Sequence, residues 1–95
     1  MEPQFTWDPK KAEANLRKHG VSFSEAVTVF VDPLARIHDD LAHSTRERRE
    51  IIVGHSNQSR LLLVSFSERG NVIRIISARK ATSHERKDYQ ERDSI

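Results

Sequence analysis

The chain of 95 residues contains no cysteine, only 3 glycines and 3 prolines, and 6% aromatic residues. The absence of cysteine excludes a disulfide framework, thiolate metal sites and a cysteine nucleophile. No apolar run approaches the roughly 20 residues that a membrane helix needs. The first five residues also lack the basic and apolar regions of a secretory signal. We therefore expect a cytoplasmic protein that makes no membrane contact.

The residues that are present indicate a globular chain, because 36% are hydrophobic and 32% are charged. This length predicts one domain over residues 1–95. Residues 1–45 hold 5 basic and 7 acidic residues, net −2, whereas residues 46–95 hold 11 and 7, net +4. Positive charge is therefore concentrated in the second half, which suits either a phosphate-binding surface or a solvated basic face.

The first 20 residues predict a short strand and a helix. The strand is expected at residues 5–7, whose aromatic side chains we assign to the core. Asp8 followed by Pro9 is a strong helix start, since the carboxylate caps free amides and proline fits the first turn. The helix is expected to run to about His19, and Gly20 supplies the stop.

A second helix is expected to begin at the capping box Ser22-Phe23-Ser24-Glu25, in which Glu25 reaches back to the Ser22 amide. Its apolar residues recur at helical spacing, so one face should be buried, and Asp32-Pro33 should end it. Together, residues 9–31 superficially fit a helix-turn-helix, which leaves a non-catalytic nucleic-acid or protein-binding module as the alternative function. The second helix offers few base-reading side chains and no lysine or arginine, which argues against DNA reading.

The second half predicts strands and a last helix. A polar loop is expected at residues 39–46, and turn residues at 67–71 join the last two strands. The box Thr82-Ser83-His84-Glu85 opens a helix through about Glu91. The expected strands are an edge strand at residues 34–38 and strands at 49–55, 61–66 and 72–76. The order β-α-α-β-β-β-β-α, with hairpin-length connections, predicts an α+β domain with an antiparallel sheet packed by helices.

Candidate chemistry gathers at the end of the last strand. RNA can be cut without a metal if a base removes the 2′-hydroxyl proton and cations stabilise the phosphate in the transition state. We expect Arg74 and Arg79 to supply such cations, and Lys80 to contact phosphate or transfer a proton. A regular strand would place the two arginines on opposite faces, and a bulge near Ala78 would reorient Arg79. Arg74 is equally explained by a carboxylate partner such as Glu47 or Glu68.

The acid–base candidates are Glu68 and His55, because both lie near strand ends and histidine titrates near neutral pH. His38 and His43 flank the polar loop, but their spacing matches no recognisable metal-ligand pattern, so no metal site or cofactor is predicted. The basic residues expected to bind RNA phosphates are Arg49, Arg60, Arg69, Arg79 and Lys80. The amides after Thr82 are a further phosphate-binding alternative to a plain helix cap.

Several short motifs, in order and over nearly the whole chain, resemble the BrnT family. They are Trp7-Asp8-Pro9, Asn15-Leu16-Arg17-Lys18-His19-Gly20-Val21-Ser22-Phe23, Glu25-Ala26, Val29-Phe30, Asp32-Pro33 and Ile73-Arg74-Ile75-Ile76-Ser77-Ala78-Arg79-Lys80-Ala81-Thr82. One segment departs from the family pattern: in Glu47-Arg48-Arg49-Glu50, Arg49 keeps the arginine position, whereas Arg48 and Glu50 do not fit.

The resemblance implies a RelE-like fold and a toxin of a type II toxin–antitoxin system. Members of the family are ribonucleases, a class of hydrolase, that stop translation. The resemblance also implies a BrnA-like antitoxin with a ribbon-helix-helix region, through which the complex would contact DNA and repress its own promoter. RNA is the expected substrate. A pure adaptor without catalysis remains open at this point, since no residue in the sequence alone proves activity.

Overall fold

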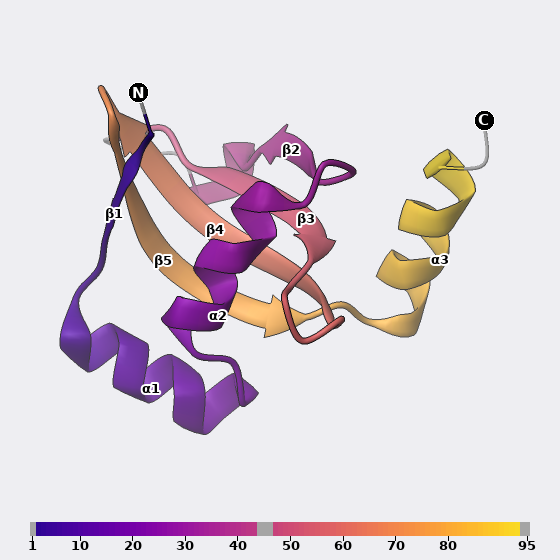
Figure 1. Ribbon diagram of the computed structural model, residues 1–95, viewed down its shortest axis with the longest axis horizontal. Coiled ribbons are helices and arrows are strands. Elements are labelled where there is room, and N and C mark those ends of the chain that lie inside the picture. The colour runs from indigo at the N-terminus through magenta and orange to yellow at the C-terminus, as the bar shows by residue number, and fades with distance from the viewer. Residues whose placement is uncertain (1, 44–46, 94–95) are drawn as a thin grey trace.

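The computed structural model describes residues 2–43 and 47–93, and within them the elements follow the predicted order (Figure 1). The predicted loop at 39–46 therefore lies partly outside the described residues. The elements are β1 (Gln4–Thr6), α1 (Pro9–His19), α2 (Phe23–Thr28), the 3-10 turn η1 (Val29–Val31), β2 (Arg36–Asp39), the 3-10 turn η2 (Leu41–His43), β3 (Glu50–His55), β4 (Leu61–Arg69), β5 (Val72–Lys80) and α3 (Ser83–Asp93).

The described strands form one five-stranded sheet in the order β1-β5-β4-β3-β2. Neighbours from β2 to β5 are antiparallel, as predicted, but β1 pairs in parallel with β5. The expectation of a wholly antiparallel sheet is therefore wrong at one edge, and the α+β fold has a mixed sheet. Short connections determine the pairing only of strands that follow one another, whereas Gln4 pairs with Val72, far along the chain.

The first helix is capped as predicted. Asp8 accepts a hydrogen bond from the Lys10 amide at 2.8 Å, and Pro9 occupies the first turn. Gly20 has a φ of 68°, which glycine adopts without strain, and its N–H donates to the Leu16 carbonyl at 2.9 Å.

The second helix starts with only half of the predicted capping box. The Ser22 hydroxyl accepts from the Glu25 amide at 3.0 Å, but the Glu25 carboxylate does not reach back. It instead accepts hydrogen bonds from Arg60 and from the Ser56 hydroxyl. Glu25 is only 4% exposed, and a buried carboxylate needs a cation more than a second cap contact.

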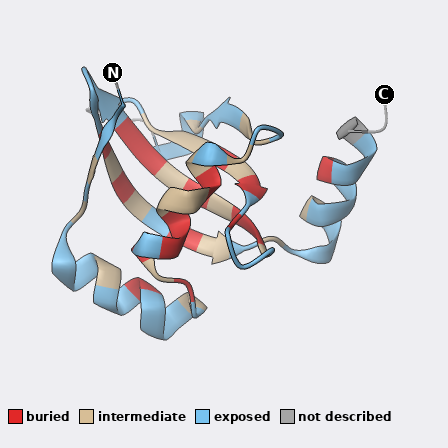
Figure 2. Cartoon of the chain, in the orientation of Figure 1, coloured by how far each residue is buried: buried red, intermediate tan, exposed pale blue. Residues whose placement is uncertain are grey.

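The core lies between these two helices and one face of the sheet. Figure 2 shows buried residues along the strands beneath α2. The Phe30 ring contacts Phe5 and Phe66 at centroid distances of 5.1 and 5.0 Å, and Trp7 contacts Phe23 at 6.0 Å. Phe5 and Trp7 pack against the core cluster, which confirms their predicted structural role. The buried members of that cluster are Val21, Phe23, Ala26, Val29, Ile52, Leu62, Val64, Phe66, Ile73, Ile75 and Ala78.

The last two strands are longer than predicted. Strand β4 continues to Arg69 and β5 begins at Val72, so the turn shortens to two residues, with Gly70 at a φ of 60°. Pairing of Phe66 with Ile75 but of Ser65 with Ser77 leaves one extra residue in β5, Ile76. This β-bulge reverses the alternation of side chains beyond it.

A buried asparagine joins α1 to β5. Asn15 is 7% exposed, and its amide nitrogen donates to the carbonyls of Val21 and Ala78 at 2.9 and 2.8 Å. Its amide oxygen accepts from the Ala78 N–H at 3.1 Å. Because β1 covers β5 only as far as Arg74, the Asn15 side chain takes the place of a neighbouring strand at Ala78.

The last helix begins with the predicted capping box. The Glu85 carboxylate accepts from the Thr82 amide at 2.9 Å, and the Thr82 hydroxyl accepts from the Glu85 amide at 3.2 Å. The buried Tyr89 anchors the helix, since its hydroxyl donates to the Leu34 carbonyl at 2.9 Å. Among the described residues, no helix is long and apolar enough to cross a membrane.

Candidate nucleic-acid interface

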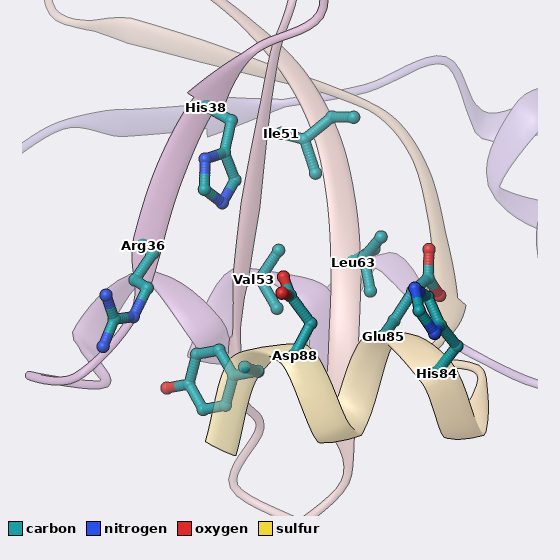
Figure 3. Close-up of a pocket in the computed structure, with 9 residues that line it drawn as sticks. Arg36, His38, Ile51, Val53, Leu63, His84, Glu85 and Asp88 are labelled. Atoms are coloured by element: carbon teal, nitrogen blue, oxygen red, sulfur yellow. The ribbon is translucent and has the colours of Figure 1, made fainter. Parts of the chain in front are cut away.

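The sheet face that does not contact α1 and α2, here called the open face, carries three clefts of about 320, 350 and 340 Å³. The α3 cavity, the first, is lined by Arg36, His38, Ile51, Val53, Leu63, His84, Glu85, Asp88 and Tyr89 (Figure 3). The cation cleft, the second, is lined by Asp40, His43, Arg49, Ile51, Leu63, Ser65, Ile76, Ser77 and Arg79. The edge cleft, the third, is lined by Thr6, Glu47, Ser67, Arg69, Val72 and Arg74.

The bulge in β5 places Arg74 and Arg79 on the same face. Arg79 pairs with Leu63 across the strands, and Arg74 pairs with Ser67, both of which line open-face clefts. The structure thus decides the question that the sequence left open, because a regular strand would have separated the two arginines. They still lie in different clefts, Arg79 in the cation cleft and Arg74 in the edge cleft.

Arg79 forms a two-point ion pair with Glu85. Its Nη1 and Nη2 atoms donate to the two carboxylate oxygens at 2.7 and 2.8 Å. Mainly through these hydrogen bonds, the pKa of Glu85 falls to about 2 although partial burial opposes the shift, and the pKa of Arg79 rises. The pair holds the guanidinium at the rim of the cation cleft, where a phosphate has to share it with Glu85 or replace that carboxylate.

Arg74 forms an ion pair with a carboxylate, the structural alternative given for it above. The partner is Glu47 rather than Glu68. The hydrogen bond from Arg74 holds the pKa of Glu47 below its ordinary value. Both side chains are partly exposed in the edge cleft, beside Arg69. The ion pair and a phosphate contact therefore compete for one guanidinium.

An aspartate–histidine pair lies in the cation cleft and was not recognised from the sequence as a catalytic candidate. The Nδ1 atom of His43 lies 3.0 and 3.1 Å from the two carboxylate oxygens of Asp40. The Asp40 side chain is 13% exposed and that of His43 is 68% exposed, so a held carboxylate orients an accessible imidazole. The local signal for this pair is the spacing Asp40-Leu41-Ala42-His43, because side chains three residues apart on a helical turn lie next to each other.

The other acid–base candidates lie elsewhere. Glu68 pairs with Ile73, and Lys80 with Leu62, so both occupy positions on the sheet face that α1 and α2 cover. His55 ends β3, and its ring contacts Tyr89 at 5.9 Å and lies 3.9 Å from an Asp32 oxygen. None of the three lines the cation cleft.

The predicted phosphate-binding arginines separate into two groups. Arg49 lines the cation cleft and Arg69 lines the edge cleft, so both lie on the open face. Arg60 instead forms an ion pair with the buried Glu25 and donates to the Gly20 carbonyl at 3.1 Å. The hydrogen bond from Arg60 also lowers the pKa of Glu25. Arg60 thus has a structural contact that the sequence did not reveal.

Helix α2 does not have the geometry of a DNA-reading helix. It has six residues, and Phe23, Glu25 and Ala26 are buried against the sheet. The helix-turn-helix alternative for residues 9–31 therefore gains no support from the fold. Within residues 2–43 and 47–93, no group of three or more His, Cys, Asp or Glu side chains is arranged to hold a metal ion.

Arginines line the cation cleft and the edge cleft, an arrangement that suits phosphate binding, and comparison with known families identifies the class of protein. A family model described as "Ribonuclease toxin, BrnT, of type II toxin-antitoxin system" matches residues 7–85. The chain therefore belongs to the BrnT family of ribonuclease toxins. No curated protein matches the chain.

A solved structure has a similar fold. The crystal structure of the Brucella abortus ribonuclease toxin BrnT, at 1.1 Å resolution, superposes with a TM-score of 0.66 and 23% sequence identity. The match covers 85% of this chain and 99% of the other. At this identity the likeness concerns the fold, and it supports the arrangement of helices and mixed sheet described above.

Proposed function

We propose that this protein is a metal-independent endoribonuclease and that the cation cleft is its cleavage site. The observation that carries the proposal is the presence of Arg49, Arg79 and the Asp40–His43 pair around one cleft of about 350 Å³. These are the groups that metal-free cleavage of RNA needs, namely a base and cations beside the phosphate. Membership of a ribonuclease toxin family supports the same reaction class.

The pair orients the base for proton transfer. With the His43 Nδ1–H donating to Asp40, the Nε2 atom is the one that accepts the 2′-hydroxyl proton. The 2′-oxygen then attacks phosphorus, the bond from phosphorus to the 5′-oxygen breaks, and the leaving oxygen takes a proton from solvent in the open cleft. Arg79 and Arg49 stabilise the charge that develops on the phosphate oxygens. The products are a 2′,3′-cyclic phosphate and a 5′-hydroxyl.

Flanking phosphates would follow the open face. Arg69 and Arg74 line the neighbouring edge cleft, so the RNA backbone can extend from the cation cleft towards them. Lys80, Glu68, His55 and Arg60 are left out of the reacting group, because they do not line the cation cleft.

The proposal is tested by incubating the purified protein, free of any antitoxin, with RNA in EDTA. We expect cleavage that leaves cyclic phosphate ends, and a loss of about 10²–10⁴-fold in the variant His43→Gln, the range typical of general base catalysis. The matched control is His55→Gln, which changes the same side chain outside the cleft and should keep activity. Cleavage of a substrate that lacks the 2′-hydroxyl, or unchanged cleavage by His43→Gln, would remove this mechanism.

We further propose that a BrnA-like antitoxin neutralises the protein, and that the complex represses its own promoter through the antitoxin's ribbon-helix-helix region. Membership of a type II toxin–antitoxin family supports an antitoxin partner. In this proposal the target is cytoplasmic RNA, its cleavage stops translation, and the fold is RelE-like. Co-expression tests the partner: a BrnA-like protein should co-purify with the chain and restore growth, and failure of both would exclude it.

A further inference from the structure

We propose that the α3 cavity binds the nucleobase next to the scissile phosphate and so sets the sequence preference of cleavage. The inference rests on the proposed ribonuclease function and adds a second subsite to it. Its occupant is one unstacked base of the RNA substrate. Three features support it, namely the shape of the cavity, its polar groups and its position beside the cation cleft.

The cavity has the shape of a small-ligand site. Its volume of about 320 Å³ falls at the lower end of the range of known ligand pockets, roughly 300–1,000 Å³. Ile51 and Val53 from β3 and Leu63 from β4 form an apolar floor, and Tyr89 from α3 closes one side. RNA-binding proteins commonly recognise bases that are splayed out of the stack, and a flat base fits such an apolar floor.

The rim of the cavity carries groups that recognise base edges. In Figure 3, His38 on β2 and Asp88 on α3 point into the cavity from opposite sides. An ionised carboxylate only accepts hydrogen bonds, so Asp88 favours a base with an exocyclic amino group, as in adenine, cytosine and guanine. Uracil has no amino group, and its remaining base-edge donor, the ring N3–H, lies between two carbonyl oxygens that a carboxylate repels. Arg36, whose guanidinium carbon lies 5.8 Å from the centre of the Tyr89 ring, helps to fix the wall between β2 and α3.

The cavity adjoins the proposed cleavage site. Ile51 and Leu63 line both the α3 cavity and the cation cleft. Glu85 lines the cavity and at the same time binds Arg79 of the cation cleft. A phosphate that reaches Arg79 therefore brings an attached nucleotide to the mouth of the cavity, so that cleavage and base recognition involve adjacent parts of one strand.

The test uses oligodeoxynucleotides with a single ribonucleotide, so that one bond can be cut, and varies the base on each side of that bond. We expect kcat/KM to be about 10- to 100-fold lower with uracil at one of these positions than with an amino-bearing base, as one hydrogen bond to a charged group would give. Val53→Phe, which fills the cavity, should abolish this discrimination. The matched control Ile37→Phe makes a comparable change at an exposed position on the opposite face of neighbouring β2 and should preserve it.

Asp88→Asn provides a second variant. An amide both donates and accepts hydrogen bonds, so this variant should cleave next to uracil as readily as next to the other bases. A wild-type protein that cuts all sequences equally, or a Val53→Phe variant that keeps the full preference, would overturn the subsite while leaving the ribonuclease proposal intact.

A binding experiment separates the two proposals. The wild-type protein is titrated with each nucleoside 3′-monophosphate while the NMR signals of the Val53 methyl groups and the Tyr89 ring are followed, because both residues line the α3 cavity and not the cation cleft. Saturable shifts of both signals, with no shift of the Tyr89 signal in Val53→Phe, are expected whether or not any RNA is cut. Absence of shifts would overturn the subsite, whereas binding without cleavage would overturn only the proposed activity.

Discussion

Replacing Asn15 with alanine should strongly destabilise the fold, because its side chain makes three buried hydrogen bonds, two with Ala78 of β5 and one with the Val21 carbonyl. Truncation leaves the Ala78 N–H and C=O and the Val21 carbonyl without these partners. Within the described residues no strand takes over the two Ala78 groups, since β1 pairs with β5 only at residues 72–74.

The expected magnitude follows from those three bonds. At about 0.5–1.5 kcal/mol each they contribute about 1.5–4.5 kcal/mol to stability. The higher helix propensity of alanine offsets about 0.5 kcal/mol of their loss. We therefore expect Asn15→Ala to lower the free energy of unfolding by about 1–4 kcal/mol. This is a large share of the total, which for a domain of this length is about 5–14 kcal/mol.

Urea denaturation followed by circular dichroism measures this change. Glu13→Ala is the matched control on the same helix, because Glu13 makes only an exposed pair with Arg17 at 3.0 Å, worth about 0.3–0.5 kcal/mol. An Asn15→Ala variant whose unfolding free energy differs from that of Glu13→Ala by less than about 0.5 kcal/mol would refute the reasoning that Asn15 replaces a strand.

Three further predictions concern packing and charge. A Cβ atom on Gly54 would lie 2.8 Å from the Cβ of Ala35, so Gly54→Ala should cost about 1–3 kcal/mol in urea unfolding; a neutral effect would show that the contact relaxes freely. Arg60→Met should lower the free energy of unfolding at pH 7, because Glu25 then stays buried without its cation. The loss of stability should be smaller at pH 4, where the Glu25 carboxylate takes up a proton more readily. An equal loss at both pH values would contradict a stabilising ion pair. Glu85, whose pKa is lowered from 4.5 to about 2, stabilises the fold above about pH 4.5 and loses that effect as the pH falls towards 2. The melting temperatures of wild type and Glu85→Gln should therefore converge over this range, and a constant difference would oppose the prediction.

Local signals in the sequence predicted the local structure well. The Asp8 cap, the stop at Gly20 and the box from Thr82 to Glu85 each involve residues within a few positions of one another, and all three are present. Short-range chemistry determines such features, so one sequence is enough to find them.

Features that depend on contacts between distant residues were not predictable in the same way. Pairing of Glu25 with Arg60 spans 35 positions, and it overrides the expected capping box. The bulge at Ile76 depends on register against β4, which no local pattern specifies, yet it decides which face Arg79 occupies. The Asp40–His43 pair is local, and its importance emerges only when folding brings Arg79 to the same cleft.

Cleavage on the open face is tested by comparing two neighbouring cations on opposite faces of β5. Arg79→Met and Lys80→Met remove adjacent positive charges, and kcat/KM for RNA cleavage in EDTA is measured for both after circular dichroism has shown that each is folded. We predict a loss of about 10²–10³-fold for Arg79→Met, the range seen when one transition-state donor is removed, and little change for Lys80→Met. Equal losses, or full activity of Arg79→Met, would contradict cleavage on the open face.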